Sequence, residues 1–539
     1  MTIGASPAPA PSVSVPTASA TGPVVRTRAG RIVGTGEEHH GRTLSVFRGV
    51  PYARPPVGAL RFRAPRPVEP WNGVRDATRF GPAFLQSGVP GSAENALYAN
   101  VWTPDPSGSR PVLVYIHGGG WQVGAGSVPT FDGAKPAAMG DLVVVNFNYR
   151  LGVFGWGLHE DLADPDTGDQ ANWGLLDQVA LLHWVRANAA AFGGDPDAIT
   201  LCGTSAGGAT ARVLAGLPEL RGTVRRLVAI SAAHAWAPAS SLTPADARTV
   251  YARLAERFGT TVAGLRALPA AELHAAWLRF FGGAPADRPV SSGREYRGPV
   301  RDGRTVTGFA HELPLPDIPT MVVHNSTEGS FFTDPLSPSF PPAPPAPTDG
   351  AGLRAAVRDV LLKCTPQVPA SLADACVAAY REAAEADGLP ADPRTLWTEI
   401  WGDALFRHQI VRQAERHARE GRAPQYVMEF AHPVRPPHYG TPHDATSKFL
   451  FGSHGHPLNI GQFGDGPLER RISDTFVDLV SSFAHGSAPS SAHAPEWPVF
   501  DTGRPSTLVV GGPGVATVTT TPKLRQLQFW DDIHWVPRA

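Results

Sequence analysis

Cysteine is scarce in this chain of 539 residues, which contains only Cys202, Cys364 and Cys376. Three cysteines are too few for the disulfide framework of a small secreted scaffold. A bond between Cys364 and Cys376 stays open, although two free thiols in a reducing cytoplasm are the simpler interpretation. Because apolar residues make up 42% of the chain, we expect a sizeable hydrophobic core to hold the fold.

An excess of charge and a long apolar run are also missing. The chain has 47 Lys and Arg residues against 48 Asp and Glu residues, which leaves a formal net charge of -1. Such a balance creates no field that attracts nucleic acid or an anionic membrane. No apolar stretch reaches the roughly 20 residues that cross a bilayer. We therefore expect a soluble protein that binds a small-molecule substrate, with no nucleic acid and no membrane span.

Basic residues and a continuous apolar block are absent from residues 1–22, which are rich in Ala, Pro, Ser and Thr. A secretory signal requires both features. We interpret residues 1–22 as a disordered leader and predict a cytoplasmic protein, while export by an atypical signal stays open.

The pattern from residue 111 onward is that of an α/β protein. Five short β-branched runs lack polar alternation, as strands of a parallel sheet do when both faces are covered. A helix is predicted from Gly174 to about Ala191, with Asp177 and Gln178 on its polar side. This helix joins two of the strands in a right-handed crossover. The five predicted strands are 111–116, 142–149, 198–202, 226–231 and 318–323.

Outside these strands, the sequence predicts antiparallel strands, inserted helices and a hairpin. The portion up to about Trp102 has the pattern of short antiparallel strands and loops. Residues 244–303 and 353–422 have the pattern of inserted helices. The Pro-rich stretch 334–350 between them is expected to be a surface loop or part of a lid. Residues 507–521 predict a β-hairpin.

The segment Gly203-Thr-Ser-Ala-Gly207 directly follows the predicted strand at 198–202. Gly-x-Ser-x-Gly after a buried strand is the sequence form of a nucleophile elbow, in which the glycines let a strand and a helix approach closely. The pattern alone arises by chance in a chain with 57 glycines, so its context decides. A strand precedes it and a helix can begin by Ala209. We predict that Ser205 is the nucleophile of a serine hydrolase.

Backbone N–H donors for an oxyanion are predicted in the segment His117-Gly-Gly-Gly-Trp121. An acyl-transfer serine needs such donors, which contribute about two to three powers of ten in rate. Three glycines allow the backbone to turn its amides towards a substrate without a Cβ in the way. A flexible turn is the alternative interpretation, but the pairing with an elbow favours an oxyanion hole.

In a series of motifs the chain resembles the type-B carboxylesterase family, which includes bacterial carboxylesterases and, more distantly, the cholinesterases. The resemblance implies one large domain at 23–539 with the α/β-hydrolase fold. This fold has a central, mostly parallel sheet flanked by helices, and large helical insertions form a lid region. The matching segments, which place residues 24 to 539 in family order, are 47–58, 94–102, 117–121, 148–152, 174–178, 192–196, 203–208, 327–329 and 403–407.

The resemblance also implies a Ser-Glu-His triad. The acid of the family lies in an Asp-Glu-Gly element after a strand, which here is Thr327-Glu-Gly329, so Glu328 is the candidate. The histidine of the family lies in Gly-x-x-His-x-x-Glu before an aromatic strand. Here Gly440-Thr-Pro-His443 precedes Phe449-Leu-Phe-Gly452, so His443 is the candidate among 19 histidines. The reaction requires no metal and no cofactor, and the matching oxyanion donors are the amides of Gly119, Gly120 and Ala206.

Two residues beside the predicted triad depart from the family. Thr204 precedes the serine and Thr446 follows the histidine by three positions, and the family usually has Glu at both. Because the two carboxylates belong to one buried polar network, their joint loss indicates a coupled exchange. A site with less negative charge favours neutral or anionic substrates over cationic ones. A neutral repacking without effect on substrate choice stays open.

Other departures concern the pocket and the early disulfide of the family. Ser231-Ala-Ala stands where the family has Ser-Gly-Ser near the acyl pocket, and we group Trp121 with these pocket residues. Phe84 and Ala96 stand where cysteines are common, and the loop between them contains no tryptophan, so a cholinesterase is not expected. The resemblance also predicts two internal ion pairs, Arg48 with Glu94 and Arg150 with Asp177.

The function implied by the resemblance is the hydrolysis of small-molecule carboxylic esters through an acyl-enzyme. An acyltransferase or cyclase stays open, because an alcohol or amine can capture the same acyl-serine in place of water. A non-catalytic binding protein on this fold normally lacks the serine or the histidine, and both are present. The sequence makes no prediction about the oligomeric state.

Overall fold

The computed structural model describes residues 22–232, 243–282, 298–308, 313–334, 346–364 and 368–533. All but the last residue of the predicted leader at 1–22 therefore lies outside the described residues. The same holds for 335–345 of the Pro-rich stretch and for the side chain of Cys364. Every helix in the described ranges is either too short or too polar to span a bilayer.

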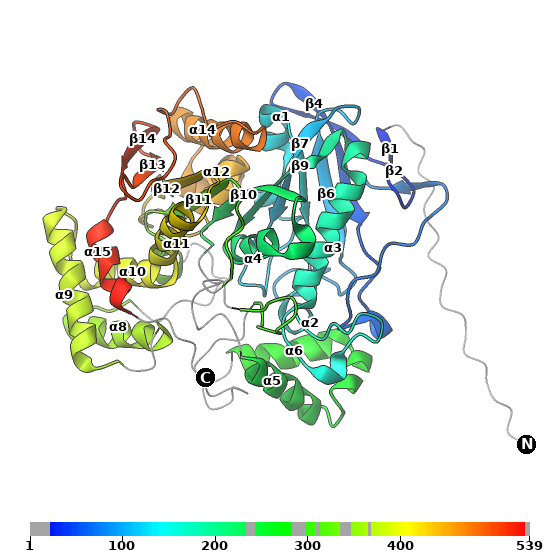
Figure 1. The fold of residues 1–539 in the computed structure, drawn as a ribbon, viewed down its shortest axis with the longest axis horizontal. Coiled ribbons are helices and arrows are strands. Elements are labelled where there is room, and N and C mark those ends of the chain that lie inside the picture. The colour runs from blue at the N-terminus through cyan, green and yellow to red at the C-terminus, as the bar shows by residue number, and fades with distance from the viewer. Residues whose placement is uncertain are drawn as a thin grey trace, which may run out of the picture.

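A sheet of eleven strands runs through the described part of the chain, in the order β14-β13-β12-β11-β10-β9-β7-β8-β6-β4-β3 (Figure 1). Neighbouring strands are parallel from β8 across to β13 and antiparallel at both edges. The predicted parallel sheet, the antiparallel N-terminal strands and the C-terminal hairpin are confirmed. The strands are β3 (Thr35–His39), β4 (Arg42–Pro51), β6 (Tyr98–Thr103), β7 (Arg110–Ile116), β8 (Val143–Phe147), β9 (Gly194–Thr204), β10 (Val224–Ile230), β11 (Thr320–Asn325), β12 (Gln425–Phe430), β13 (Ser506–Val510) and β14 (Ala516–Thr520).

Both faces of the sheet are buried, which explains the unbroken apolar runs of its central strands. In β7, Val112 and Val114 pack into one core cluster, whereas Leu113 and Tyr115 pack into a second cluster on the opposite face. A separate small sheet joins β1 (Val24–Arg26), β2 (Arg31–Val33) and β5 (Val74–Asp76). Helices α3 (Trp173–Asn188) and α4 (Ala206–Gly216) contribute to the first cluster, and α1 (Ala134–Gly140), α12 (Ala445–Leu450) and α14 (Pro467–Ala484) contribute to the second.

Within the described residues, both of the regions that were predicted as inserted helices contain helices. In the first, α5 and α6 lie together at one end of the molecule (Figure 1). In the second, α8 to α11 pack beside the sheet, and the C-terminal α15 lies against them (Figure 1). These helices are α5 (Pro244–Arg257), α6 (Ala270–Gly282), α8 (Gly350–Cys364), α9 (Ala370–Ala386), α10 (Pro393–Gly402), α11 (His408–Glu420) and α15 (Leu524–Gln528), with a π-helical turn at Asp403–Arg407 between α10 and α11.

Two expectations about local structure were wrong. The segment beginning at Phe449, which we expected to start a strand, lies at the end of helix α12. All six residues of this helix are buried, so tertiary packing decides its conformation. In α3, Asp177 and Gln178 were expected on a polar side, but both are 0% exposed, because this helix is buried on most sides.

One of the two predicted ion pairs is confirmed and the other is wrong. The guanidinium of Arg150 donates to both carboxylate oxygens of Asp177, over 2.7 and 2.8 Å. Glu94 instead accepts from Arg61 over 2.5 and 2.8 Å, while Arg48 pairs with Glu37. Arg48 and Glu37 lie on the paired strands β4 and β3, whereas Arg61 and Glu94 lie outside the strands.

Candidate active site

Ser205 occupies the turn between β9 and α4, at the carboxyl end of the parallel strands (Figure 1). Its backbone has φ 57° and ψ −124°, a conformation that is sparsely populated for residues with a Cβ and costs about 1–3 kcal/mol. The amide of Ser205 donates to the carbonyl of Ile230 on β10 over 2.8 Å, which holds the turn. The strand-turn-helix context that was predicted from the sequence is confirmed, and the side chain lies at the amino end of α4.

The His117–Trp121 loop lies directly on this turn. A Cβ on Gly118 would come within 2.8 Å of the Thr204 carbonyl and 3.0 Å of the Ser205 Cβ, so only glycine allows the approach. Gly119 and Gly120 have φ values of 109° and 60°, in the region that glycine tolerates. The two predicted donor positions of the loop follow directly after Gly118, which touches the elbow, and Ala206 is the first residue of α4.

His117 anchors the start of this loop. Its ring stacks on Tyr149 with 4.5 Å between centroids, and the Tyr149 hydroxyl donates to the His117 carbonyl over 2.9 Å. The ring Nδ1 lies 2.8 Å from the Gly118 carbonyl and donates to it. Burial lowers the pKa of His117 to about 4, so the ring is neutral at physiological pH.

Glu328 and His443 form a buried pair in the segments that follow two neighbouring strands. Glu328 follows β11, His443 follows β12, and the two residues are 1% and 4% exposed. The Nδ1 of His443 donates to Oε2 of Glu328 over 2.6 Å. The other ring nitrogen, Nε2, is buried and has no hydrogen-bond partner among the described residues. The structure therefore brings together the acid and the histidine that the sequence selected.

Two further residues fix this pair. The hydroxyl of Ser231 donates to Oε1 of Glu328 over 2.6 Å, and the backbone amide of Asn325 donates to the same oxygen over 2.7 Å. The side-chain amide of Asn325 also donates to the His443 carbonyl over 2.9 Å. We expected Ser231 near the acyl pocket, but its hydroxyl is directed to the acid. Asn325 was missed, and its position at the end of the strand before the acid was the available signal.

Aromatic rings enclose the His443 imidazole. The Phe406 ring lies closest, with 4.2 Å between centroids, and Phe331 and Phe332 each lie at 5.9 Å. Phe332 in turn stacks on Phe406. These contacts fix the ring plane and exclude water from it. None of the three phenylalanines was identified as a site residue from the sequence.

Thr204 belongs to a small network of hydroxyl groups beside the serine. Tyr115 donates to the Thr204 hydroxyl over 3.1 Å, and Ser447 donates to it over 3.2 Å. The Thr446 hydroxyl is buried and has no partner among the described residues. The predicted link between the two threonines is thus replaced by a contact to Ser447, which the sequence analysis did not single out. Every polar side chain of this network is uncharged.

Trp121 has a structural position in the loop. It is 1% exposed, packs on Trp156 and would contact a Cβ at Gly298. Its carbonyl accepts from the amide of Gly152 over 2.8 Å. The residue therefore fixes the far end of the His117–Trp121 loop. Among the described residues, no group of three or more His, Cys, Asp or Glu side chains could hold a metal ion.

Comparison with known proteins relates this chain to carboxylesterases. A model described as "Carboxylesterase family" matches residues 21–530. The phenmedipham hydrolase of Pseudarthrobacter oxydans is 32% identical over 92% of this chain and 96% of its own. The para-nitrobenzyl esterase of Bacillus subtilis is 45% identical, over 39% of this chain and 44% of its own. The crystal structure of a Geobacillus stearothermophilus carboxylesterase is similar with a TM-score of 0.77 and 31% identity, over 94% of this chain and 99% of that one.

Proposed function

We propose that this chain, a carboxylic ester hydrolase that belongs to the carboxylesterase family, cleaves small-molecule esters through Ser205, Glu328 and His443. The observation that carries the proposal is the 2.6 Å hydrogen bond from His443 Nδ1 to Glu328 Oε2. This bond assigns the proton to Nδ1 and leaves the Nε2 lone pair to accept the serine proton. A carboxylate, an oriented imidazole and a strained serine are the parts that nucleophilic catalysis requires.

In the proposed reaction, the Oγ of Ser205 attacks the ester carbonyl while His443 Nε2 takes the hydroxyl proton. The imidazolium gains stability from the Glu328 carboxylate, which keeps its charge. His443 then gives the proton to the leaving alcohol, and an acyl-serine forms. Water attacks the acyl-serine with the same base, which releases the acid and restores Ser205.

The oxyanion of each tetrahedral intermediate is proposed to bind the amides of Gly119, Gly120 and Ala206. Positive φ at both glycines and the contact of Gly118 with the elbow support this assignment. The Ala206 amide lies at the amino end of α4, where the helix dipole favours negative charge. Donors of this kind contribute about 10²–10³ in rate.

The substrate is proposed to be neutral or anionic. Support comes from the uncharged hydroxyl network of Tyr115, Thr204 and Ser447 beside the nucleophile. Burial raises the pKa of Tyr115 well above its ordinary value, so this phenol carries no charge at neutral pH. A cationic substrate would therefore find no counter-charge in this network.

Labelling tests the central part of the proposal. A fluorophosphonate should modify the wild type on the peptide that contains Ser205, and Ser205→Ala should neither label nor hydrolyse aryl and alkyl esters. Glu328→Gln should retain slow labelling and lose about 10⁴ in kcat, because the imidazole tautomer is no longer fixed. If Ser205→Ala keeps wild-type esterase activity, the assignment of the nucleophile is wrong.

Thr204→Glu tests the proposed charge preference, and Thr204→Gln is its matched neutral control. The ratio of kcat/KM for a cationic ester to that for an anionic ester of the same length should rise about tenfold in Thr204→Glu. Thr204→Gln should leave the ratio unchanged. Equal ratios in both variants would show that charge at this position does not select the substrate.

A further inference from the structure

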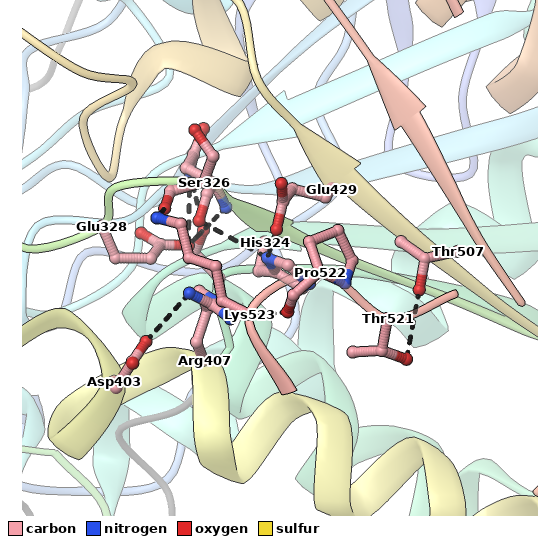
Figure 2. Close-up of polar contacts among 12 residues, drawn as sticks. His324, Ser326, Glu328, Asp403, Arg407, Glu429, Thr507, Thr521, Pro522 and Lys523 are labelled. Carbon is pink, nitrogen blue, oxygen red and sulfur yellow. Dashed lines mark hydrogen bonds and ion pairs between the residues drawn. The ribbon is translucent and has the colours of Figure 1, made fainter. Parts of the chain in front are cut away.

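Behind the proposed acid lies a cluster of buried and half-buried charged side chains, which we call the C-terminal charge cluster (Figure 2). It joins α10, the π-helical turn, β12 and the segment before α15. Arg407 lies 3.2 Å from Asp403 and donates to the Pro522 carbonyl over 3.0 Å. The members of the cluster are Glu399, Asp403, Arg407, Glu429 and Lys523.

Lys523 is the member of this cluster that contacts the loop of the acid. Its ammonium donates to the Ser326 carbonyl over 2.9 Å (Figure 2). It also donates to both oxygens of Glu399 over 2.8 Å. Ser326 directly follows β11 and stands two residues before Glu328. The side chains of Lys523 and Glu399 are 17% and 16% exposed, so solvent screens their interaction only in part.

Glu399 belongs to α10, the helix on which the other side of the same loop packs. A Cβ on Gly402 would come within 2.7 Å of the Gly329 amide and 3.4 Å of the Glu328 Cβ. Gly329, the residue after Glu328, therefore touches α10 directly. Lys523 links α10 to Ser326, which stands two residues before Glu328. The loop is held at both of its ends by one helix and one lysine.

No other cation in the cluster can replace Lys523 at this position. Arg407 is directed to Asp403 and Pro522, and its nitrogen nearest to Glu399 lies 3.8 Å away. Gln526 donates to Glu399 over 3.2 Å but carries no charge. His324 is neutral, because burial lowers its pKa to about 3.

We propose that Lys523 is a positioning residue of the ester hydrolysis. By fixing the Ser326 carbonyl against Glu399 of α10, it holds the loop that orients the Glu328 carboxylate on His443. The inference rests on the proposed role of Glu328 as the acid of the triad. It assigns to the C-terminal segment, far from Ser205 in the sequence, an effect on the rate of the chemical step that is exerted through the loop of the acid.

The test compares Lys523→Met with Lys523→Arg in the full chain, with kcat expressed per active centre titrated by a fluorophosphonate. Lys523→Met should lose about ten- to a hundredfold in kcat, because small displacements of a catalytic group are costly, while KM stays within about twofold. Lys523→Arg, which restores a cation for Glu399 and the Ser326 carbonyl, should return kcat to within about threefold of wild type. Titration removes the contribution of misfolded enzyme.

Arg61→Met is the matched control. Arg61 is another buried cation that bonds a carboxylate, Glu94, and the backbone carbonyls of Leu265 and Leu268, and no bond joins it to the proposed triad. It should lower the melting temperature and leave kcat per titrated centre unchanged. An equal loss of kcat in Arg61→Met and Lys523→Met would overturn the positioning role.

The single variant Glu399→Gln covers the case in which Lys523→Met fails to fold, and a double-mutant cycle is measured where both variants fold. Glu399→Gln keeps the shape of the side chain and should lose about threefold or more in kcat, and the double variant should be no slower than Lys523→Met. Wild-type kcat in Lys523→Met or in Glu399→Gln, or additive losses in the double variant, overturns the inference. If Ser205 is labelled and Glu328→Gln is slow in the same series, such a result refutes only the role of Lys523. Loss of the Ser205 label would refute the proposed function itself.

Discussion

Replacing Ser231 with alanine would measure how much the proposed role of Glu328 as the acid depends on the hydrogen bonds to Oε1, the carboxylate oxygen that does not bond His443. The Ser231 hydroxyl donates to Oε1 of Glu328 over 2.6 Å, while Oε2 accepts from His443 over 2.6 Å. The Asn325 amide donates to Oε1 over 2.7 Å, so the variant keeps one of the two short bonds to this oxygen. Because Ser231 is 0% and Glu328 is 1% exposed, bulk water does not replace the lost donor.

The expected loss follows from the strength of a bond to a buried charge. Such a hydrogen bond contributes about 1.5–3 kcal/mol. If the loss falls on the transition state, kcat/KM declines about ten- to a hundredfold, since each 1.36 kcal/mol is about tenfold. Alanine keeps the Cβ of Ser231, whose φ is 48°, so the backbone strain is unchanged and the measurement isolates the hydroxyl.

The assay is steady-state hydrolysis of an aryl ester together with a thermal melt. Ser473→Ala is the control, because Ser473 is also 0% exposed and donates to the Phe449 carbonyl, outside the proposed triad. Ser231→Gly also lacks the hydroxyl but relieves about 1–3 kcal/mol of backbone strain, so it should be more stable than Ser231→Ala and equally slow. Wild-type kcat/KM in Ser231→Ala, or recovery of activity in Ser231→Gly, would refute the role of the hydroxyl.

Three further predictions concern the glycine loop and the buried charges. A methyl group on Gly118 would lie 3.0 Å from the Ser205 Cβ, so Gly118→Ala should lower kcat at least about a hundredfold in the same assay. Burial lowers the pKa of His117 to about 4. Below about pH 6.5, His117 therefore binds a proton in the unfolded chain but not in the folded chain. The contribution of His117 should lower the free energy of unfolding by up to about 3 kcal/mol as the pH drops from 6.5 to 4. In urea titrations, the free energy of unfolding of His117→Asn should therefore depend less on pH than that of the wild type. Asp177→Asn leaves Arg150, which is 1% exposed, without its counter-charge and should lower the free energy of unfolding by about 3–5 kcal/mol, a loss that a melt would detect.

Residues that act through local geometry could be predicted from the sequence. The elbow at Ser205 and the glycine loop at 118–120 depend on a strand, a turn and glycines that are consecutive in the chain. The central strands could be predicted because burial on both faces leaves an unbroken apolar run. Motif position alone selected Glu328 and His443, and the structure places the two in contact.

Strand β12 could not be predicted, because its polar residues interrupt the apolar pattern. Gln425 and Glu429 are both buried, and Glu429 stands opposite His324 in the register of the neighbouring β11. Burial raises the pKa of Glu429, and a polar partner from the next strand lies 3.7 Å away. A buried polar residue is tolerated in a strand when its partner comes from elsewhere in the fold, and the sequence of one segment does not reveal that partner.

The partner of Thr204 could not be predicted either, because it also comes from a distant segment of the chain. Thr204 and Thr446 were linked because both replace a carboxylate of the family, yet the hydroxyl that reaches Thr204 belongs to Ser447. Consecutive residues of α12 point about 100° apart, so a difference of one position decides which side chain faces β9. With Tyr115 as the third member, the network satisfies Thr204 with hydroxyl groups alone. The carboxylate of Thr204→Glu would therefore meet two hydroxyl donors and no cation in this network. Because its charge is not compensated there, we expect the substitution to change substrate selection as well as stability.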